Sequence, residues 1–384
     1  MEAIAENQPI PRHLQRVIRP GKSIQELAAE LTRIEESKRD FTVPVNKLEA
    51  KVITDPLSDL QKMAISFTNG ETHDFTLNNW SSGQLAQFTD IPREYFRRVS
   101  EENPALMAQN VNHGLRQVQQ DDETKSRLVR TIDGHVRGFL SHRYRMLDSH
   151  DLMEAVLPML VENQFEVVSS EVTEKRLYLK TATPRIQGEV KTGDVVSYGV
   201  MISTSDVGAG SLRVEPFFLR LWCLNGAVST STFRRAHLGR SNAEREIQEI
   251  LTDDTKRLND QAFFATVRDY MANTMKPAVF QAELKKMQDA ANRPIRNLDL
   301  ESVVEVTMKT VGVTGEGVKK GILEALADGN QNAGLTQWGL MNSFTAAAKM
   351  DSIDYDTATD LERAGGAILN LNKSQWSRIA EVQH

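Results

Sequence analysis

Residues 213–235 read RVEPFFLRLWCLNGAVSTSTFRR, and this stretch predicts a β-hairpin at the centre of the fold. Asn225 and Gly226 favour a two-residue turn, because both central positions of such a turn need positive φ. Arg220 would then lie opposite Ser231 on the returning strand. The stretch is bounded by further strand-like segments, so we expect an antiparallel sheet built from hairpins.

Alternation along this hairpin sorts its side chains onto two faces. One face is apolar and holds Phe217, Leu219, Leu221, Cys223 and Val228. The other face mixes aromatic, basic and small polar residues, namely Phe218, Arg220, Trp222, Ser229, Ser231, Phe233 and Arg235. Aromatic rings and arginines on an open sheet can stack bases and neutralise phosphates, which predicts a platform for single-stranded nucleic acid. If a helix covers this face instead, Arg220 extends to the surface or pairs with an acid.

A second hairpin is predicted for residues 127–141, around the turn pair Asp133-Gly134. Its cross-strand pairs would be Thr131/Val136, Arg130/Arg137 and Leu128/Phe139. Two arginines directly opposite each other repel, so an acidic side chain or a bound anion must lie within contact distance of both. The sequence leaves open whether a structural salt-bridge network or a phosphate site provides that charge.

Basic residues are concentrated in the middle of the chain, although its formal charge is −6. Residues 116–145 contain seven basic and four acidic residues, and residues 211–240 contain five arginines and one glutamate. Residues 241–384 contain 16 basic and 21 acidic residues. This distribution permits a local polyanion site and also head-to-tail self-association. The predicted nucleic-acid-binding residues are Arg130, Arg137, Arg143, Tyr144, Arg145, Phe218, Arg220, Trp222, Phe233, Arg234, Arg235 and Arg240.

The remaining pattern predicts an α+β protein with an antiparallel β-hairpin sheet core packed with helices, followed by a mainly helical C-terminal region. The expected divisions are an N-terminal arm and helix over residues 1–40, an α+β core over 41–240 and a helical region over 241–384. Ser23 is placed to cap the first helix. Asn69-Gly70 predicts one more hairpin within residues 63–77.

Several classes of protein are excluded or disfavoured. No apolar run is long enough to cross a bilayer, and no secretory signal is expected. The single cysteine, Cys223, excludes an intrachain disulfide and a cysteine-based zinc site, so we expect a cytoplasmic protein. No common nucleotide-binding, metalloprotease or nucleophile motif occurs, so we expect no cofactor and no enzyme activity. Asp148, His150 and Asp151 lie close together in sequence and could hold a metal ion, but the grouping also suits a helix start.

Three stretches together carry a resemblance to a known family. Residues 128–148 read LVRTIDGHVRGFLSHRYRMLD, residues 84–95 read QLAQFTDIPREY and residues 221–226 read LWCLNG. Together, in their order along the chain, they resemble the phage/plasmid-related proteins called domain of unknown function 932, over roughly residues 40–380. The hairpin-then-helix order is also reminiscent of phage single-strand annealing proteins of the Redβ and Erf types. That likeness, an architectural analogy, implies ring formation and binding of single-stranded DNA along a basic groove.

Three functions therefore compete. The first is a phage- or mobile-element-encoded protein that binds or anneals single-stranded DNA without nucleotide or metal. The second is an interaction protein that binds a host or defence protein through the same arginine and aromatic residues. The third is an enzyme whose site is assembled from scattered residues, which a deep pocket with converging titratable groups would favour.

Overall fold

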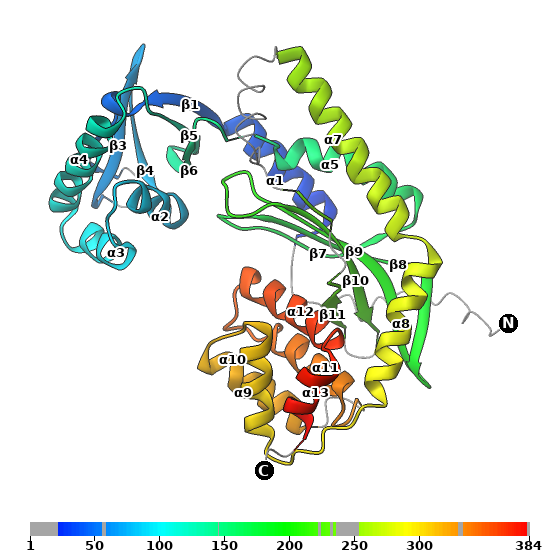
Figure 1. Ribbon diagram of the computed structural model, residues 1–384. Coiled ribbons are helices and arrows are strands. Elements are labelled where there is room, and N and C mark those ends of the chain that lie inside the picture. Colours follow the sequence, from blue (N-terminus) through cyan, green and yellow to red (C-terminus); the bar gives the residue numbers. More distant parts are fainter. Residues whose placement is uncertain are drawn as a thin grey trace.

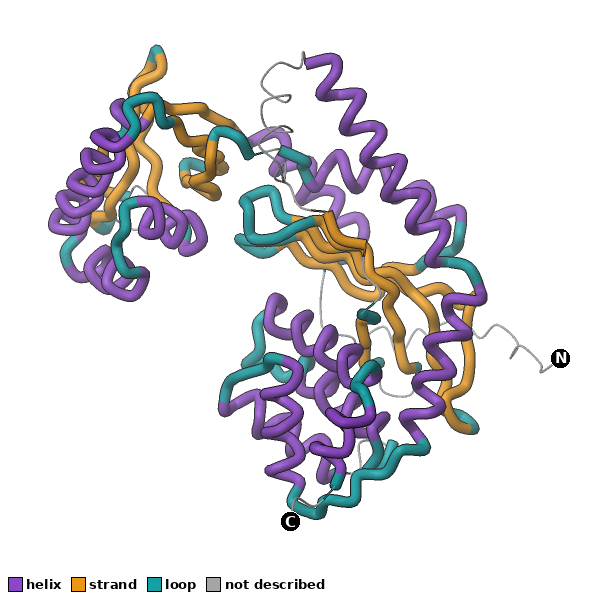
Figure 2. The backbone as a smooth tube through the Cα atoms, in the orientation of Figure 1, coloured by secondary structure: helices purple, strands orange, loops and turns teal. Residues whose placement is uncertain are grey.

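The computed structural model describes residues 22–55, 59–144, 146–221, 224–230, 233–235, 253–328 and 333–381. Its strands form two sheets, and every named element after residue 253 is a helix. The predicted α+β class with a helical C-terminal region is therefore confirmed. Figure 2 shows the strands in two separate groups, each with helices against it. Within the described ranges, no helix combines the length and apolar character needed to cross a membrane.

The first sheet has six strands in the order β1-β5-β6-β4-β3-β2. They are β1 (Arg39–Pro44), β2 (Glu49–Thr54), β3 (Gln61–Asn69), β4 (Glu71–Leu77), β5 (Ser126–Ile132) and β6 (His135–Ser141), with the 3-10 turn η1 (Val45–Lys47) after β1. Three helices cover one face, α2 (Asn79–Phe88), α3 (Arg93–Glu102) and α4 (Pro104–Asp121). The predicted hairpin around Gly70 is present as β3–β4. Asn112 of α4 closes the edge of β2, bonding both backbone polar groups of Ala50 at 2.7 Å.

The second sheet has the strand order β11-β10-β9-β8-β7, with β12 also pairing β10. Its strands are β7 (Glu166–Val172), β8 (Leu177–Lys191), β9 (Asp194–Thr204), β10 (Leu212–Arg220), β11 (Asn225–Val228) and β12 (Phe233–Arg235). The helices near it are α1 (Ile24–Ser37), α5 (Ser149–Glu162), α7 (Asp253–Thr274), α8 (Pro277–Ala291), α9 (Leu300–Val311), α10 (Glu316–Ala327), α11 (Gln337–Ala347), α12 (Tyr355–Leu369) and α13 (Lys373–Ala380).

Both faces of the second sheet are covered by helices (Figure 1). Helices α1, α5 and α7 pack against one face, in a cluster that includes Leu179 and Ile202. Helix α12 packs against the opposite face, where Lys180 Nζ lies 2.6 Å from Glu362 Oε2. A sheet covered on both faces offers no open platform except at its edges.

Helices α1 and α5 flank the first sheet in sequence, yet both pack against the second sheet. Leu31 of α1 and Val156 of α5 belong to the same apolar cluster as Ile202 of β9. Ser23 caps α1 as predicted, with its hydroxyl accepting from the Glu26 amide at 3.2 Å. Residues 39–144 are therefore a unit inserted into the larger one (Figure 1). The single core expected over residues 41–240 is thus divided between two sheets, and the C-terminal helices join the second.

The β5–β6 hairpin has the predicted two-residue turn. Asp133 and Gly134 adopt φ of 48° and 78°, the left-handed values that such a turn requires. Thr131 pairs with Val136 on the opposite strand, as predicted. The Asp-Gly pair therefore determines where this hairpin reverses.

Beyond that first pair, the predicted register of β5–β6 is wrong. A bulge leaves Arg137 as the extra residue, so Arg130 pairs with Gly138. Leu128 consequently pairs with Leu140 instead of Phe139. A bulge shifts every following pair by one position and so changes which side chains share a face. The expected opposition of Arg130 and Arg137 is absent.

The predicted turn in the β10–β11 hairpin is also wrong. Asn225 and Gly226 lie within β11, and Asn225 pairs with Arg220. The chain reverses between the paired residues Arg220 and Asn225, and the amide of Leu224, a residue with φ 54°, donates to the Arg220 carbonyl at 2.8 Å. Arg220 therefore does not face Ser231. The hairpin itself exists, but its turn lies before the Asn-Gly pair.

Candidate nucleic-acid interface

The predicted stacking platform on the second hairpin is closed at Phe218. This side chain is 3% exposed. Its ring stacks on Phe280 of α8 with 6.3 Å between centroids and lies 5.6 Å from the ring of Tyr198. The expectation of an accessible Phe218 is wrong, because α8 covers this part of the sheet.

Arg220 is likewise internal, with 3% exposure. Its Nε and Nη2 donate to Asp194 Oδ1 and Oδ2 at 2.5 and 2.9 Å. Trp338 of α11 donates its indole N–H to the same carboxylate at 3.0 Å, and its ring lies 5.6 Å from the guanidinium carbon. The alternative prediction, that Arg220 pairs with an acid beneath a helix, is confirmed.

The other predicted residues of this hairpin have no described side chains. Trp222 and Arg240 lie outside the described residues, as does Arg145 of the first hairpin. Phe233, Arg234 and Arg235 form β12, which pairs with Leu212–Val214 of β10. Their backbone adds a short strand to the sheet edge.

Arg130 of the first hairpin is completely buried. Its Nε and Nη2 each donate to a carboxylate oxygen of Asp40 at 2.9 Å, and Nη2 also donates to Asp148 at 2.8 Å. Nη1 donates to the backbone carbonyl of Asp206 at 2.8 Å. The predicted acidic partner is therefore present, and it removes the reason to expect an anion at Arg130.

Arg137 and Tyr144 also point into the protein. Arg137 Nη1 lies 3.6 Å from Asp206 Oδ2, while its buried Nε and Nη2 have no hydrogen-bond partner among the described residues. Burial and the neighbouring charge of Asp148 raise the pKa of Asp206. The Tyr144 hydroxyl donates to the Ser205 carbonyl at 2.8 Å. These residues join the two units and do not form an external binding surface.

Cationic side chains remain at the surface where β5 begins and β6 ends. We call this region the basic end, and it consists of Phe88, Lys125, Arg127, His142 and Arg143. His142 and Arg143 are exposed, and the other three are half-buried. The strand pairing brings the group together, since Arg127 lies opposite Ser141, the residue before His142. Of the predicted site residues with described side chains, Arg143 alone is exposed.

Arg127 is the unusual member of the basic end. Its guanidinium carbon lies 4.4 Å from the centroid of the Phe88 ring and 4.9 Å from that of Phe139. Nη2 donates to the Phe139 carbonyl at 2.7 Å, and the buried Nε has no partner among the described residues. No described carboxylate pairs with Arg127, and burial lowers its pKa to about 10. It is a partly buried cation that packs against two aromatic rings and has no counter-charge among the described residues.

Sequence reasoning counted Arg127 among the basic residues but missed its role. A usable signal was present, since Arg127 and Arg130 lie three positions apart on one strand and so point to opposite faces. Phe88 could not be found in this way, because it comes from α2 and reaches the strands only in the folded protein. Lys125 Nζ lies 5.4 Å from the same Phe88 ring.

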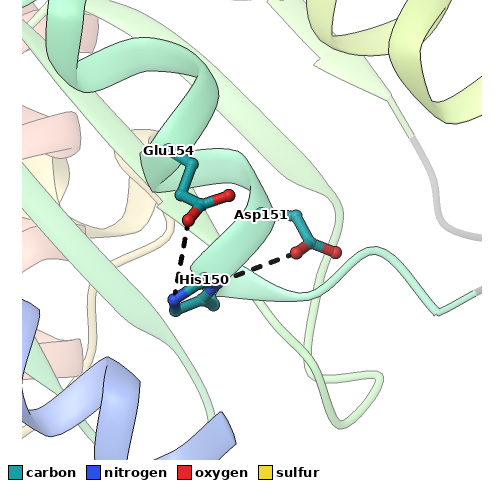
Figure 3. A group of neighbouring side chains, drawn as sticks. All are labelled: His150, Asp151 and Glu154. Carbon is teal, nitrogen blue, oxygen red and sulfur yellow. Dashed lines mark ion pairs between the residues drawn. The ribbon is translucent and has the colours of Figure 1, made fainter.

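A small group of possible metal ligands lies at the start of α5. Figure 3 shows His150 facing the carboxylates of Asp151 and Glu154, with separations of 3.7 and 4.0 Å. Burial and the nearby Asp148 raise the pKa of Asp151. Asp148 itself does not join the group, contrary to the grouping in sequence, because it pairs with Arg130. The group has the composition of an exposed helix start, and nothing else at this position indicates a bound ion.

A small cavity between the second sheet and the C-terminal helices is lined by Lys180, Phe217 and Glu362, among others. Burial opposes the charge of Lys180, but Glu362 outweighs it and raises the pKa of the amine. Lys180 also lies 4.5 Å from the Tyr355 ring. A protonated, paired lysine is a poor nucleophile, so this cavity offers little support for the enzyme hypothesis.

Comparisons with protein-family models, curated proteins and solved structures find no match for this chain. The resemblance carried by residues 84–95, 128–148 and 221–226 therefore stays a prediction.

Proposed function

We propose that the chain binds single-stranded nucleic acid at the basic end of the first sheet. The observation that supports this is the guanidinium of Arg127, which has no carboxylate partner among the residues that the structure describes. Burying a cation without a counter-charge is unfavourable, and a phosphate at the basic end would supply the missing negative charge. His142 and Arg143 are exposed beside it and would add further phosphate contacts.

The aromatic neighbours of Arg127 favour a single strand over a duplex. Phe88 is half-buried next to the guanidinium plane, and exposed bases stack both on aromatic rings and on arginine planes. A duplex keeps its base faces stacked and would use only the charges. We therefore expect binding to depend on Phe88 as well as on the cations.

Asp122 borders the basic end. Hydrogen bonds from Thr124, together with the nearby charges of Lys125 and Arg143, lower the pKa of Asp122. Asp122 is thus ionised at neutral pH and opposes a phosphate at this side. Asp122→Asn should therefore strengthen nucleic-acid binding, whereas the removal of Arg127 should weaken it.

The same proposal includes an annealing role, self-association, action without a cofactor and a relationship to the phage family. They depend on the sequence resemblance, with Arg127 and its neighbours as the supporting site. Location in the cytoplasm of a host cell follows from the same resemblance. The competing proposal is an interaction protein whose basic end contacts an acidic partner protein.

The test is a fluorescence anisotropy titration of a labelled oligothymidylate at several salt concentrations. We expect Arg127→Met to reduce affinity and to make the slope of log affinity against log salt shallower by about one. The matched control is Arg268→Met, which removes an exposed arginine from α7 in the other unit. Arg268→Met should leave both quantities close to those of the wild type.

Folding of each variant is checked by thermal denaturation, because Arg127 packs on two aromatic rings. Phe88→Leu tests stacking and should weaken binding to every base sequence alike, with an unchanged salt slope. If the wild type fails to bind the oligonucleotide, the proposal is wrong and the protein-partner alternative is favoured. If the folded Arg127→Met protein binds with an unchanged salt slope, the site is wrong.

A further inference from the structure

The chain crosses between its two units twice, and the two crossings are tied together by charge. Lys38 follows the last residue of α1, and Asp148 precedes the first residue of α5. The Lys38 ammonium forms an ion pair with the Asp148 carboxylate. Both helices belong to the larger unit, while the strands beyond these residues belong to the inserted unit. This ion pair therefore lies at the point about which the units would move.

Arg130 connects this pair to the interior of the inserted unit. It lies on β5 and donates to Asp148 at 2.8 Å and to Asp40 of β1 at 2.9 Å. Arg130 has no solvent exposure, and Asp148 is 12% exposed at its side chain. Arg130 and Lys38 together hold the pKa of Asp148 below its ordinary value, although burial acts in the opposite direction. The Asp148 carboxylate thus binds both Arg130, on a strand of the inserted unit, and Lys38, in the linker that follows α1.

The loop between β9 and β10 makes the second connection. Asp206 Oδ1 accepts from the amide and the hydroxyl of Ser149 at 3.0 and 2.7 Å, so this loop caps α5. The carbonyl of Val207 accepts from Trp80 Nε1 and Gln84 Nε2 of α2, both at 2.8 Å. Beyond the linkers, this loop contacts one helix and one hairpin of the inserted unit, and Arg33 of α1 pairs with Asp133 in the turn of that hairpin at 2.5 Å.

The polar contacts at this junction are incomplete. Arg137 Nη1 stands 3.6 Å from Asp206 Oδ2, beyond hydrogen-bonding distance, and two further donors of Arg137 are buried without a described partner. Small polar contacts between domains permit relative motion, whereas large apolar contacts do not. The junction thus has a closely paired ion network at the linkers. The contact beside it is small, and some hydrogen-bond donors of Arg137 there are unsatisfied among the described residues.

We propose that the ion network of Lys38, Asp148, Arg130 and Asp40 is a conformational latch between the two units. With the latch closed, the inserted unit, residues 39–144, is held in the arrangement of Figure 1. With the latch broken, the inserted unit rotates about the two linkers while both units stay folded. This inference does not depend on which ligand the basic end binds.

The test measures the distance between spin labels placed on the two units, at Gln109→Cys on α4 and Gln281→Cys on α8, with Cys223 replaced by serine. Both label positions are exposed and helical. We expect one narrow distance distribution in this parent protein. Arg130→Met and Lys38→Met should each add a second population at a different distance, and Lys38→Arg should restore the single population.

Lys51→Met is the matched control. It removes an ion pair of similar length, Lys51 Nζ to Asp74 Oδ1 at 2.6 Å, that lies wholly within the inserted unit. It should leave the distance distribution unchanged. Lys38 is near the surface, so Lys38→Met keeps the test decisive if the buried Arg130 variant does not fold. A folded Lys38→Met protein with the parent distribution would overturn the latch, as would a parent distribution that is already broad.

Discussion

The β5–β6 and β10–β11 hairpins both carry an Asx-Gly pair, but only β5–β6 uses it as the turn. Gly134 has φ 78° and open space around it, so glycine there serves backbone conformation. Gly226 does not have a left-handed backbone, and a Cβ atom at this position would overlap the ring of Phe217. The same dipeptide motif thus has two physical meanings, and local sequence does not distinguish them.

The two hairpins also show what a buried arginine does on a strand. Arg130 and Arg220 lie on strands rich in apolar residues, and each binds an aspartate through two guanidinium nitrogens. Arg127, near the end of a strand, has no such partner in the part of the chain that the structure describes. An arginine among aromatic residues is therefore evidence of a ligand site only when its acidic partner is missing.

The largest expected effect is the loss of the buried pair in the second hairpin. Arg220→Met leaves Asp194 buried with Trp338 as its remaining described side-chain donor, which should lower the free energy of unfolding by about 3–5 kcal/mol. Urea denaturation measures the loss, with the exposed Arg268→Met as the control. Adding Asp194→Leu should recover much of it, because the unpaired charge is then removed. A loss no larger than that of the control would contradict this role of Arg220.

A smaller effect is expected at Gly226. Gly226→Ala places a methyl group against the Phe217 ring and should cost about 1–3 kcal/mol through overpacking. If volume is the cause, Phe217→Leu in the same chain should recover part of the loss, as a double-mutant cycle in urea denaturation would show. Strict additivity of the two losses would show that overlap with the Phe217 ring is not the cause.

The smallest effect is expected at Gly134, where space is available and φ alone matters. Gly134→Ala should cost about 1 kcal/mol, because alanine disfavours the left-handed region. Gly134→Asn should cost less, since asparagine tolerates that region. Thermal denaturation of the two variants beside the wild type tests this order. Equal losses for alanine and asparagine would mean that packing, not conformation, selects glycine here.

The position of the Asp133-Gly134 turn could be predicted because it depends on two adjacent residues. The register beyond it could not, since the bulge at Arg137 accompanies the contact of that side chain with Asp206 of a distant loop. The candidate site was likewise predictable only where it depended on neighbouring residues in the sequence. The basic character of residues 116–145 was readable, but which of its arginines stay unpaired depended on where Asp40, Asp148 and Asp206 come to lie.

By itself, the sequence determined the α+β class, the cap of α1 at Ser23 and the helical C-terminal region, because helix caps, turns and side-chain periodicity are local properties. Only the tertiary structure decided that Phe218 is covered by Phe280, since residues 62 positions apart meet only once α8 packs on the sheet. It also decided that Arg220 pairs with Asp194, while Arg127 has no carboxylate partner among the described residues. Burial and charge pairing depend on neighbours brought from distant segments, and a pattern along one strand contains no information about them.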